Sequence, residues 1–169
     1  MFVHDFVAIP RPVDGALAGL TDVLAGDLGR LVAEAWAADT AVWTAAGLDV
    51  ADLEPSRPIP LTVDGPRSRD AGAVVHLSWT SEGARLVPSV DCDLELIARG
   101  PALSDLQIMG RYRFGDLPPR SAAETSIAHR ATVTAIRRLL DALSTEIQQR
   151  DRPDGAGAGR GAGRPTMRN

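Results

Sequence analysis

The chain of 169 residues has one cysteine, no lysine and few aromatic side chains. Because Cys92 is alone, an intramolecular disulfide is excluded, and with it the disulfide-stapled secreted scaffolds. No apolar run approaches the ~18 residues of a membrane span, so we expect no membrane insertion. The first ten residues lack a basic region before their short apolar stretch, which predicts no signal peptide and a cytoplasmic protein.

Charge divides the chain into a body and a tail. Residues 1–150 hold 14 Arg against 20 Asp and Glu, a net charge of −6, and an acidic body disfavours nucleic acid as a partner. Residues 151–169 are dominated by Gly, Ala, Arg and Pro and are expected to be disordered. An RNA-binding Arg-Gly segment would interleave aromatic residues, and this tail has none. The sequence therefore predicts one domain, 1–150, followed by a tail, 151–169.

The strongest helix signal runs from about 122 to 149. Ser121 and Glu124 form an S-x-x-E capping box after two prolines. An apolar stripe follows with alternating spacings of four and three, through His129, Val133, Ile136, Leu140, Leu143 and Ile147. Since only one face of this long helix is apolar, we expect it to lie across a sheet.

Four segments in the middle of the chain alternate between apolar and polar residues, which predicts antiparallel strands with one solvated face. They are Ile59–Val63, Val75–Trp79, Val90–Leu96 and Leu106–Phe114, with turn residues at 64–72, 81–88 and 99–101. Ahead of them, Phe2–Ile9 is predicted as a strand. A short helix over Val13–Leu24 and a second helix from Asp27 to Gly47 are expected to follow it.

A turn near Gly100–Pro101 predicts the register of the last two strands. On the outer face it places two carboxylates opposite or diagonal to two guanidinium groups, from Asp91, Asp93, Arg111 and Arg113. Such opposite-charge pairs contribute about 0.2–1 kcal/mol each. The same register brings four residues together on the inner face, namely Cys92, Leu94, Ile108 and Tyr112.

This order of one strand, two helices, four antiparallel strands and one long helix resembles the START-like superfamily, also called SRPBCC. The opening FVAIPRPVDGALAGLTD is similar to that family's start, where a strand runs through a proline-containing turn into a short helix. Further along, the chain resembles actinobacterial members related to polyketide cyclases and lipid-transfer-like proteins. The residues concerned are Trp79, Gly83, Leu86-Val-Pro88, Asp91-x-Asp93-x-Glu95, Gly110-x-Tyr112 and His129-Arg130. Over residues 2–149 the resemblance implies an α+β helix-grip fold, in which a curved antiparallel sheet wraps around a long C-terminal helix.

The resemblance also implies a cavity between the sheet and the long helix, suited to a small hydrophobic ligand. The candidate lining residues are Phe6, Trp36, Trp43, Leu61, Trp79, Cys92, Leu94, Ile108, Tyr112, His129 and Val133. Aromatic side chains with one polar atom suit pockets that hold a ligand in one orientation. The alternative is that these residues pack against one another and fill the core.

Two of these residues are candidates for catalysis. His129 lies on the apolar stripe, so it could act as a hydrogen-bond donor or general base in the cavity, or be a half-buried histidine bonded to a loop carbonyl or a carboxylate. Tyr112 could orient a ligand carbonyl or bond to backbone at the sheet edge. Cys92 is expected to be a small buried hydrophobe, not a nucleophile.

The sequence predicts no cofactor and no metal site. Asp91-x-Asp93-x-Glu95 has the spacing of a calcium loop, but it falls on an alternating strand without the glycine turn, which predicts a solvated face. His4 and His76 have no ligand spacing with Cys92 or a carboxylate, so no zinc site is visible. No glycine-rich phosphate loop follows a strand, and there is no G-x-S-x-G elbow.

Three functions fit these observations. We favour the binding of a small hydrophobic molecule, such as a lipid, a polyketide-like compound or an isoprenoid. The second is an aromatase/cyclase-like enzyme acting on a polyketide chain, with His129 and Tyr112 handling protons. The third is a protein-interaction domain with a filled core, whose signature would be an exposed apolar patch or a stable dimer. We expect a monomer or a homodimer.

Overall fold

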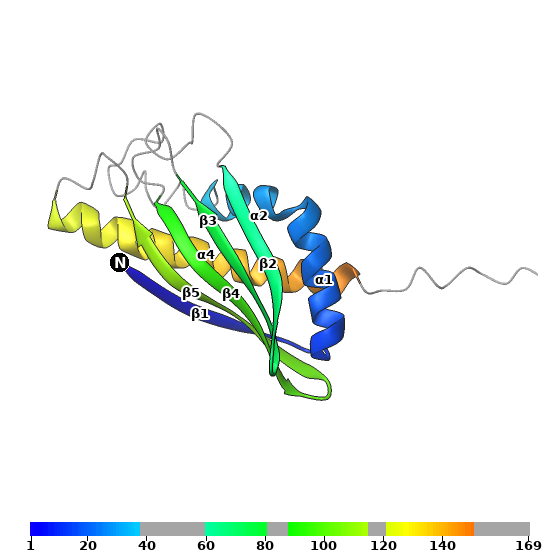
Figure 1. The fold of residues 1–169 in the computed structure, drawn as a ribbon. Helices are drawn as coiled ribbons and strands as arrows, with labels where there is room; N and C mark the ends of the chain where they lie inside the picture. The colour runs from blue at the N-terminus through cyan, green and yellow to red at the C-terminus, as the bar shows by residue number, and fades with distance from the viewer. Residues whose placement is uncertain (38–59, 81–87, 115–120, 151–169) are drawn as a thin grey trace, which may run out of the picture.

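A computed structural model describes residues 1–37, 60–80, 88–114 and 121–150. In these residues one antiparallel sheet has helices packed against one of its faces (Figure 1). Along the chain the elements are β1 (Phe2–Ile9), α1 (Val13–Gly26), α2 (Leu28–Ala37), β2 (Leu61–Arg69), β3 (Gly72–Trp79), β4 (Ser89–Gly100), β5 (Leu103–Arg113) and α4 (Ala122–Arg150). The strand order is β1-β5-β4-β3-β2. This α+β architecture, with its long C-terminal helix and two shorter helices after β1, confirms the expected helix-grip fold.

Helix α4 begins where the capping box places it and runs behind the sheet (Figure 1). The backbone N–H of Glu124 donates a hydrogen bond to Ser121 Oγ at 3.1 Å, which satisfies one of the unpaired donors of the first turn. In the middle of α4, Arg137 Nη1 donates to both Asp5 Oδ1 and the Phe6 carbonyl oxygen at 2.8 Å. These contacts fasten the helix to strand β1 at the edge of the sheet.

The buried face of α4 differs from the predicted stripe in its N-terminal half. Ile136, Leu140, Leu143 and Ile147 are buried as predicted, but Val133 is 37% exposed, so its inward placement was wrong. His129 is exposed as a residue, although its ring contacts Tyr112 of the sheet as its predicted sheet-facing position requires. Small residues are buried there instead, namely Ala128, Ala131, Thr132 and Ala135. The predicted stripe repeats every seven residues, and such a stripe drifts by about 20° per heptad around a straight helix.

Strands β3, β4 and β5 alternate between buried and solvated positions, as predicted. The turn after Gly100 produces the expected register, with Leu94 opposite Ile108 and Asp91 opposite Arg111. Strand β2 differs from the prediction because it continues through 64–69, where a loop was expected, with a register shift between Asp64 and Arg67. As an edge strand it is mostly exposed, and Val63 is 37% exposed.

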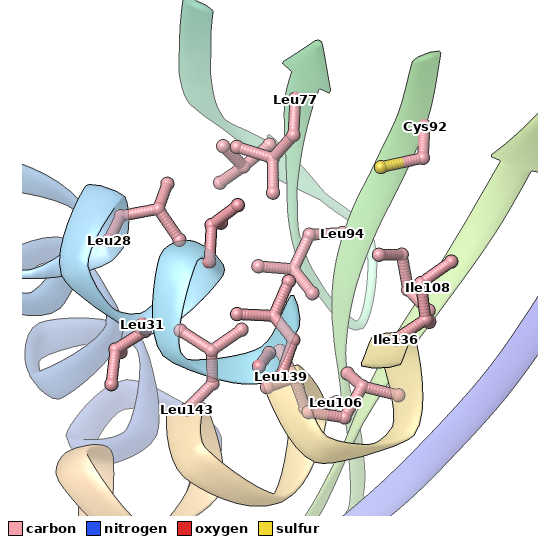
Figure 2. Close-up of a cluster of buried hydrophobic side chains, with 14 of the residues drawn as sticks. Leu28, Leu31, Leu77, Cys92, Leu94, Leu106, Ile108, Ile136, Leu139 and Leu143 are labelled. Carbon is pink, nitrogen blue, oxygen red and sulfur yellow. The ribbon is translucent and has the colours of Figure 1, made fainter. Parts of the chain in front are cut away.

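The core lies between the sheet and the helices (Figure 2). Leu94 and Ile108 extend from the sheet toward Ile136 and Leu139 of α4, while Leu28 approaches from α2. Each of these five side chains is at most 2% exposed. Because close-packed contacts bury most of the apolar surface, this layer is the main source of hydrophobic stabilisation.

Strand β1 buries the opposite face from the predicted one, which had placed Phe6 in the interior. Its inward positions are Val3 and Ile9, which are 4% and 0% exposed. Phe6 is an odd number of residues away from both, so it lies on the outer face, 54% exposed, and does not line the interior. The second helix was expected to reach Gly47; α2 is described to Ala37, and Trp43 lies outside the described residues.

Candidate functional site

The ends of four strands meet in one row, which we call the Trp79 end of the sheet. Leu61 of β2 pairs with Trp79 of β3, Trp79 pairs with Val90 of β4, and Val90 pairs with Tyr112 of β5. The N–H of Tyr112 donates to the carbonyl oxygen of Met1 at 2.9 Å, which brings the start of β1 to the same row. Trp79 and Tyr112 therefore lie two strands apart, with Cα atoms separated by about 10 Å.

An aromatic group lies on the inner side of this end, and it consists of Trp36, Trp79, Tyr112, Phe114 and His129. Trp36 of α2 packs edge-on against Trp79 at a centroid distance of 5.6 Å. Tyr112 packs edge-on against Phe114 at 5.8 Å and stacks with the ring of His129 at 6.0 Å. The sheet, α2 and α4 thus contribute two sets of rings to this end, Trp36 with Trp79 and Tyr112 with Phe114 and His129. Ring surfaces of this kind suit an apolar ligand body.

Tyr112 and His129 form the polar contact within this group. The Tyr112 hydroxyl is hydrogen-bonded to His129 Nδ1. Tyr112 is 2% exposed, and burial raises the pKa of its phenol, so the hydroxyl stays protonated at neutral pH. His129 is exposed as a whole residue, so one residue at the helix surface is hydrogen-bonded to a buried hydroxyl. Among the described residues, the Tyr112 hydroxyl therefore contacts a side chain, and not the backbone at the sheet edge as one of its two predicted roles required.

Trp79 contributes a buried donor without an acceptor. The residue is 1% exposed, and its indole Nε1 has no hydrogen-bond partner in the part of the chain that the structure describes. An indole N–H can only donate. A buried donor left unpaired costs about 1–3 kcal/mol, so native proteins keep few of them.

A hollow of about 610 Å³ opens at the same end. Trp79 and Tyr112 border it, although their side chains face inward, and the neighbouring positions Ser78, Arg111 and Arg113 face outward. The hollow therefore spans the rim of the sheet at its Trp79 end. Its volume falls within the range of small-molecule pockets, ~300–1,000 Å³. Sequence reasoning missed this rim, because outward polar residues on a strand give the same signal whether or not they border a hollow.

The remaining candidate residues divide between the aromatic group and the core. Leu94, Ile108 and Cys92 are 0–2% exposed and pack within the central core cluster. Leu61 is partly buried against that cluster at the Trp79 end. Phe114, which was not among the candidates, joins the group because it ends the alternating segment two residues after Tyr112 and contacts its ring.

The carboxylates of β4 face outward and have partners different from those predicted. His76 Nδ1 is hydrogen-bonded to Asp93 Oδ1 at 3.1 Å, and His76 Nε2 lies 3.7 Å from Asp91 Oδ1. Glu95 accepts hydrogen bonds from Arg69 at 3.2 Å and from Gln107 at 2.7 Å. Arg111 is opposite Asp91 in register, yet β3 supplies the side chain that Asp91 approaches. Among the described residues, no group of three or more His, Cys, Asp or Glu side chains is arranged to hold a metal ion.

Comparisons with known proteins identify the fold. No protein-family model matches the chain, and no curated protein matches it in sequence. Among solved structures, the Zhui aromatase/cyclase from Streptomyces sp. R1128 is similar, with a TM-score of 0.50 and 13% identity. The match covers 92% of this chain and 98% of that one. At this level of identity the likeness shows a shared fold.

None of the described helices is long and apolar enough to cross a membrane. Helix α4 has enough residues to span a bilayer, but charged side chains recur along its outer face, among them Arg130, Arg137 and Asp141.

Proposed function

We propose that this protein binds a small hydrophobic molecule at the Trp79 end, between the sheet and helix α4. The observation that carries the proposal is the aromatic group, in which Trp36, Trp79 and Tyr112 come from three elements and meet at one end of the core. The shared fold with an aromatase/cyclase supports the proposal at the level of architecture. A lipid, a polyketide-like compound or an isoprenoid would supply the apolar body.

The first test is native mass spectrometry of the purified protein, followed by solvent extraction of whatever is bound. We expect an added small apolar mass. Binding of the fluorescent hydrophobe N-phenyl-1-naphthylamine should raise the melting temperature through mass action. Trp36→Ala should weaken that binding, whereas Phe6→Ala, an aromatic change of the same kind on the outer face, should leave it unchanged.

A protein without bound mass, fluorescence response or melting shift would contradict the proposal. It would favour the interaction domain with a filled core, for which the exposed Phe2, Phe6 and Met109 of the outer face offer an apolar surface.

A second candidate function is an aromatase/cyclase-like reaction, and the hydrogen bond between Tyr112 and His129 favours it. Such a pair can relay a proton between a buried site and the helix surface. The test is formation of cyclised product from a poly-β-keto thioester, measured by chromatography and mass spectrometry. Tyr112→Phe and His129→Ala should each abolish product formation, and His4→Ala, an exposed histidine of β1, should preserve it. Unchanged turnover in the first two variants would remove these assignments.

A further inference from the structure

This inference rests on the proposed function. The unpaired indole N–H of Trp79 indicates which class of hydrophobic molecule the site would bind. Trp79 is 1% exposed, and no acceptor reaches its Nε1 within the described residues. This donor is out of reach of bulk solvent, so an acceptor supplied by a bound molecule would remove the penalty of leaving it unpaired. Trp79 also borders the 610 Å³ hollow at the rim of the sheet, although its side chain faces inward.

The surroundings define what that acceptor would be. Trp36 packs against Trp79 and Tyr112 lies farther along the same row, so ring surfaces gather at this end and favour a flat apolar body. The buried neighbours on this row, Val90 and Tyr112, are uncharged, so a neutral acceptor suits these surroundings. Since the Tyr112 hydroxyl already bonds to His129, the Trp79 N–H is the inner donor left for a ligand among the described residues at this end.

We propose that Trp79 donates its indole hydrogen bond to a neutral carbonyl oxygen of the bound molecule, so that the site selects cyclic ketones over hydrocarbons of the same shape. Simple hydrocarbon lipids and isoprenoids then bind less tightly, because they leave the donor unpaired.

Two probes of one shape test this selection. 1-Tetralone and tetralin have the same bicyclic skeleton and differ by the ketone oxygen. The wild-type protein should bind 1-tetralone about tenfold more tightly, as expected for pairing a buried donor. Trp79→Phe keeps an aromatic ring and removes the N–H, so it should bind the two probes equally. Phe6→Leu is the control: it removes an aromatic ring from the outer face, keeps the Trp79 donor, and should retain the tenfold preference.

Nuclear magnetic resonance of the wild-type protein provides a readout that does not depend on the variants' stability. The chain has three tryptophans, and the indole signal missing from Trp79→Phe identifies Trp79. That indole proton should move downfield with 1-tetralone and not with tetralin.

The outcomes separate the two proposals. Equal affinity of the wild-type protein for both probes, or a preference that survives in Trp79→Phe, overturns the role of Trp79 and leaves the hydrophobic site standing. If neither probe binds the wild-type protein, the proposed function fails together with the inference.

Discussion

Gly110 sets how closely strands β4 and β5 approach at the centre of the sheet. Its Cα is paired with that of Cys92, and a Cβ added at this position would overlap the Cys92 Cβ and the Asp91 carbonyl oxygen. The overlapped atoms are a backbone carbonyl oxygen of a strand and the first carbon of a side chain, and both have little room to move. The absence of a side chain at position 110 is therefore a packing requirement, visible in the sequence only as a glycine within an alternating run.

Gly110→Ala should lower the free energy of unfolding by about 1–3 kcal/mol, the usual cost of overpacking. Urea denaturation measures it. Gly29→Ala is the control, because a Cβ at Gly29 meets nothing within 4 Å and alanine favours helix α2. That control should gain roughly 0.5–1 kcal/mol. A Gly110→Ala protein as stable as the wild type would show that β4 and β5 can separate at this position without cost.

Cys92 should be unreactive in the folded protein. Burial, together with the carboxylates of Asp93 and Asp91, raises the pKa of its thiol from 9.0 to about 12. The thiolate fraction near neutral pH is then very small, so iodoacetamide should label Cys92 slowly in buffer and rapidly in guanidinium. Rapid labelling of the native protein would contradict the burial of this residue.

The same pKa shift has a consequence for stability. The folded-state pKa of Cys92 lies above the unfolded-state value, so its stabilising contribution is fully present below pH 9 and is lost as the pH rises toward about 12. We expect the melting temperature to fall over that alkaline range, and Cys92→Ala to reduce this part of the fall.

At the scale of elements, local sequence signals determine where α4 begins, and tertiary packing determines which of its residues are buried. The capping box predicted its first turn, and the hydrogen bond from the Glu124 N–H to Ser121 confirms that prediction. The heptad-like stripe predicted which residues of the C-terminal half are buried, but it failed for Val133, and it left His129 exposed with only its ring against Tyr112. A helix that crosses a twisted sheet changes its contact face along its length, and in the N-terminal half of α4 small residues such as Ala128 and Ala131 take the buried positions.

Ser121→Ala should destabilise the protein by about 1 kcal/mol, because it removes the side-chain acceptor at the N-cap of α4. Thermal or urea unfolding measures this loss. Ser126→Ala is the matched control: Ser126 is exposed within the helix, where alanine has the better propensity, so stability should stay equal or rise slightly. A loss of equal size in both variants would show that the cap contributes nothing specific.

At the scale of the whole molecule, the core cluster draws on residues from Val3 to Ile147 and joins the sheet to α1, α2 and α4. This span lies within the domain predicted over 1–150. It places Ile147, which is 0% exposed, next to Gly19 of α1. The last turn of α4 is therefore part of the core.

A chain ending after Arg150 should melt at the temperature of the full chain, since the described core contacts are all retained. A chain ending after Glu146 also loses Ile147 and should melt several degrees lower, as expected for a loss of a few kcal/mol. Differential scanning calorimetry distinguishes the two. A large drop for the chain ending after Arg150 would show that residues 151–169 contribute to stability.

The sequence by itself determined the class of fold, most of the elements and the register of β4 against β5. The elements and the register follow from patterns within one segment, such as alternation along Val90–Leu96, a turn at Gly100 and a cap at Ser121. The class of fold follows from the order of these elements, which carried the resemblance to the START-like superfamily. Tertiary structure decided which of two equivalent faces is buried, and so Phe6 lies on the outside of β1 and Val133 on the exposed side of α4. It also paired Tyr112 with His129, turned Asp93 toward His76 and left the Trp79 donor without an acceptor among the described residues. Each of these depends on residues distant in sequence, whose positions no local periodicity encodes.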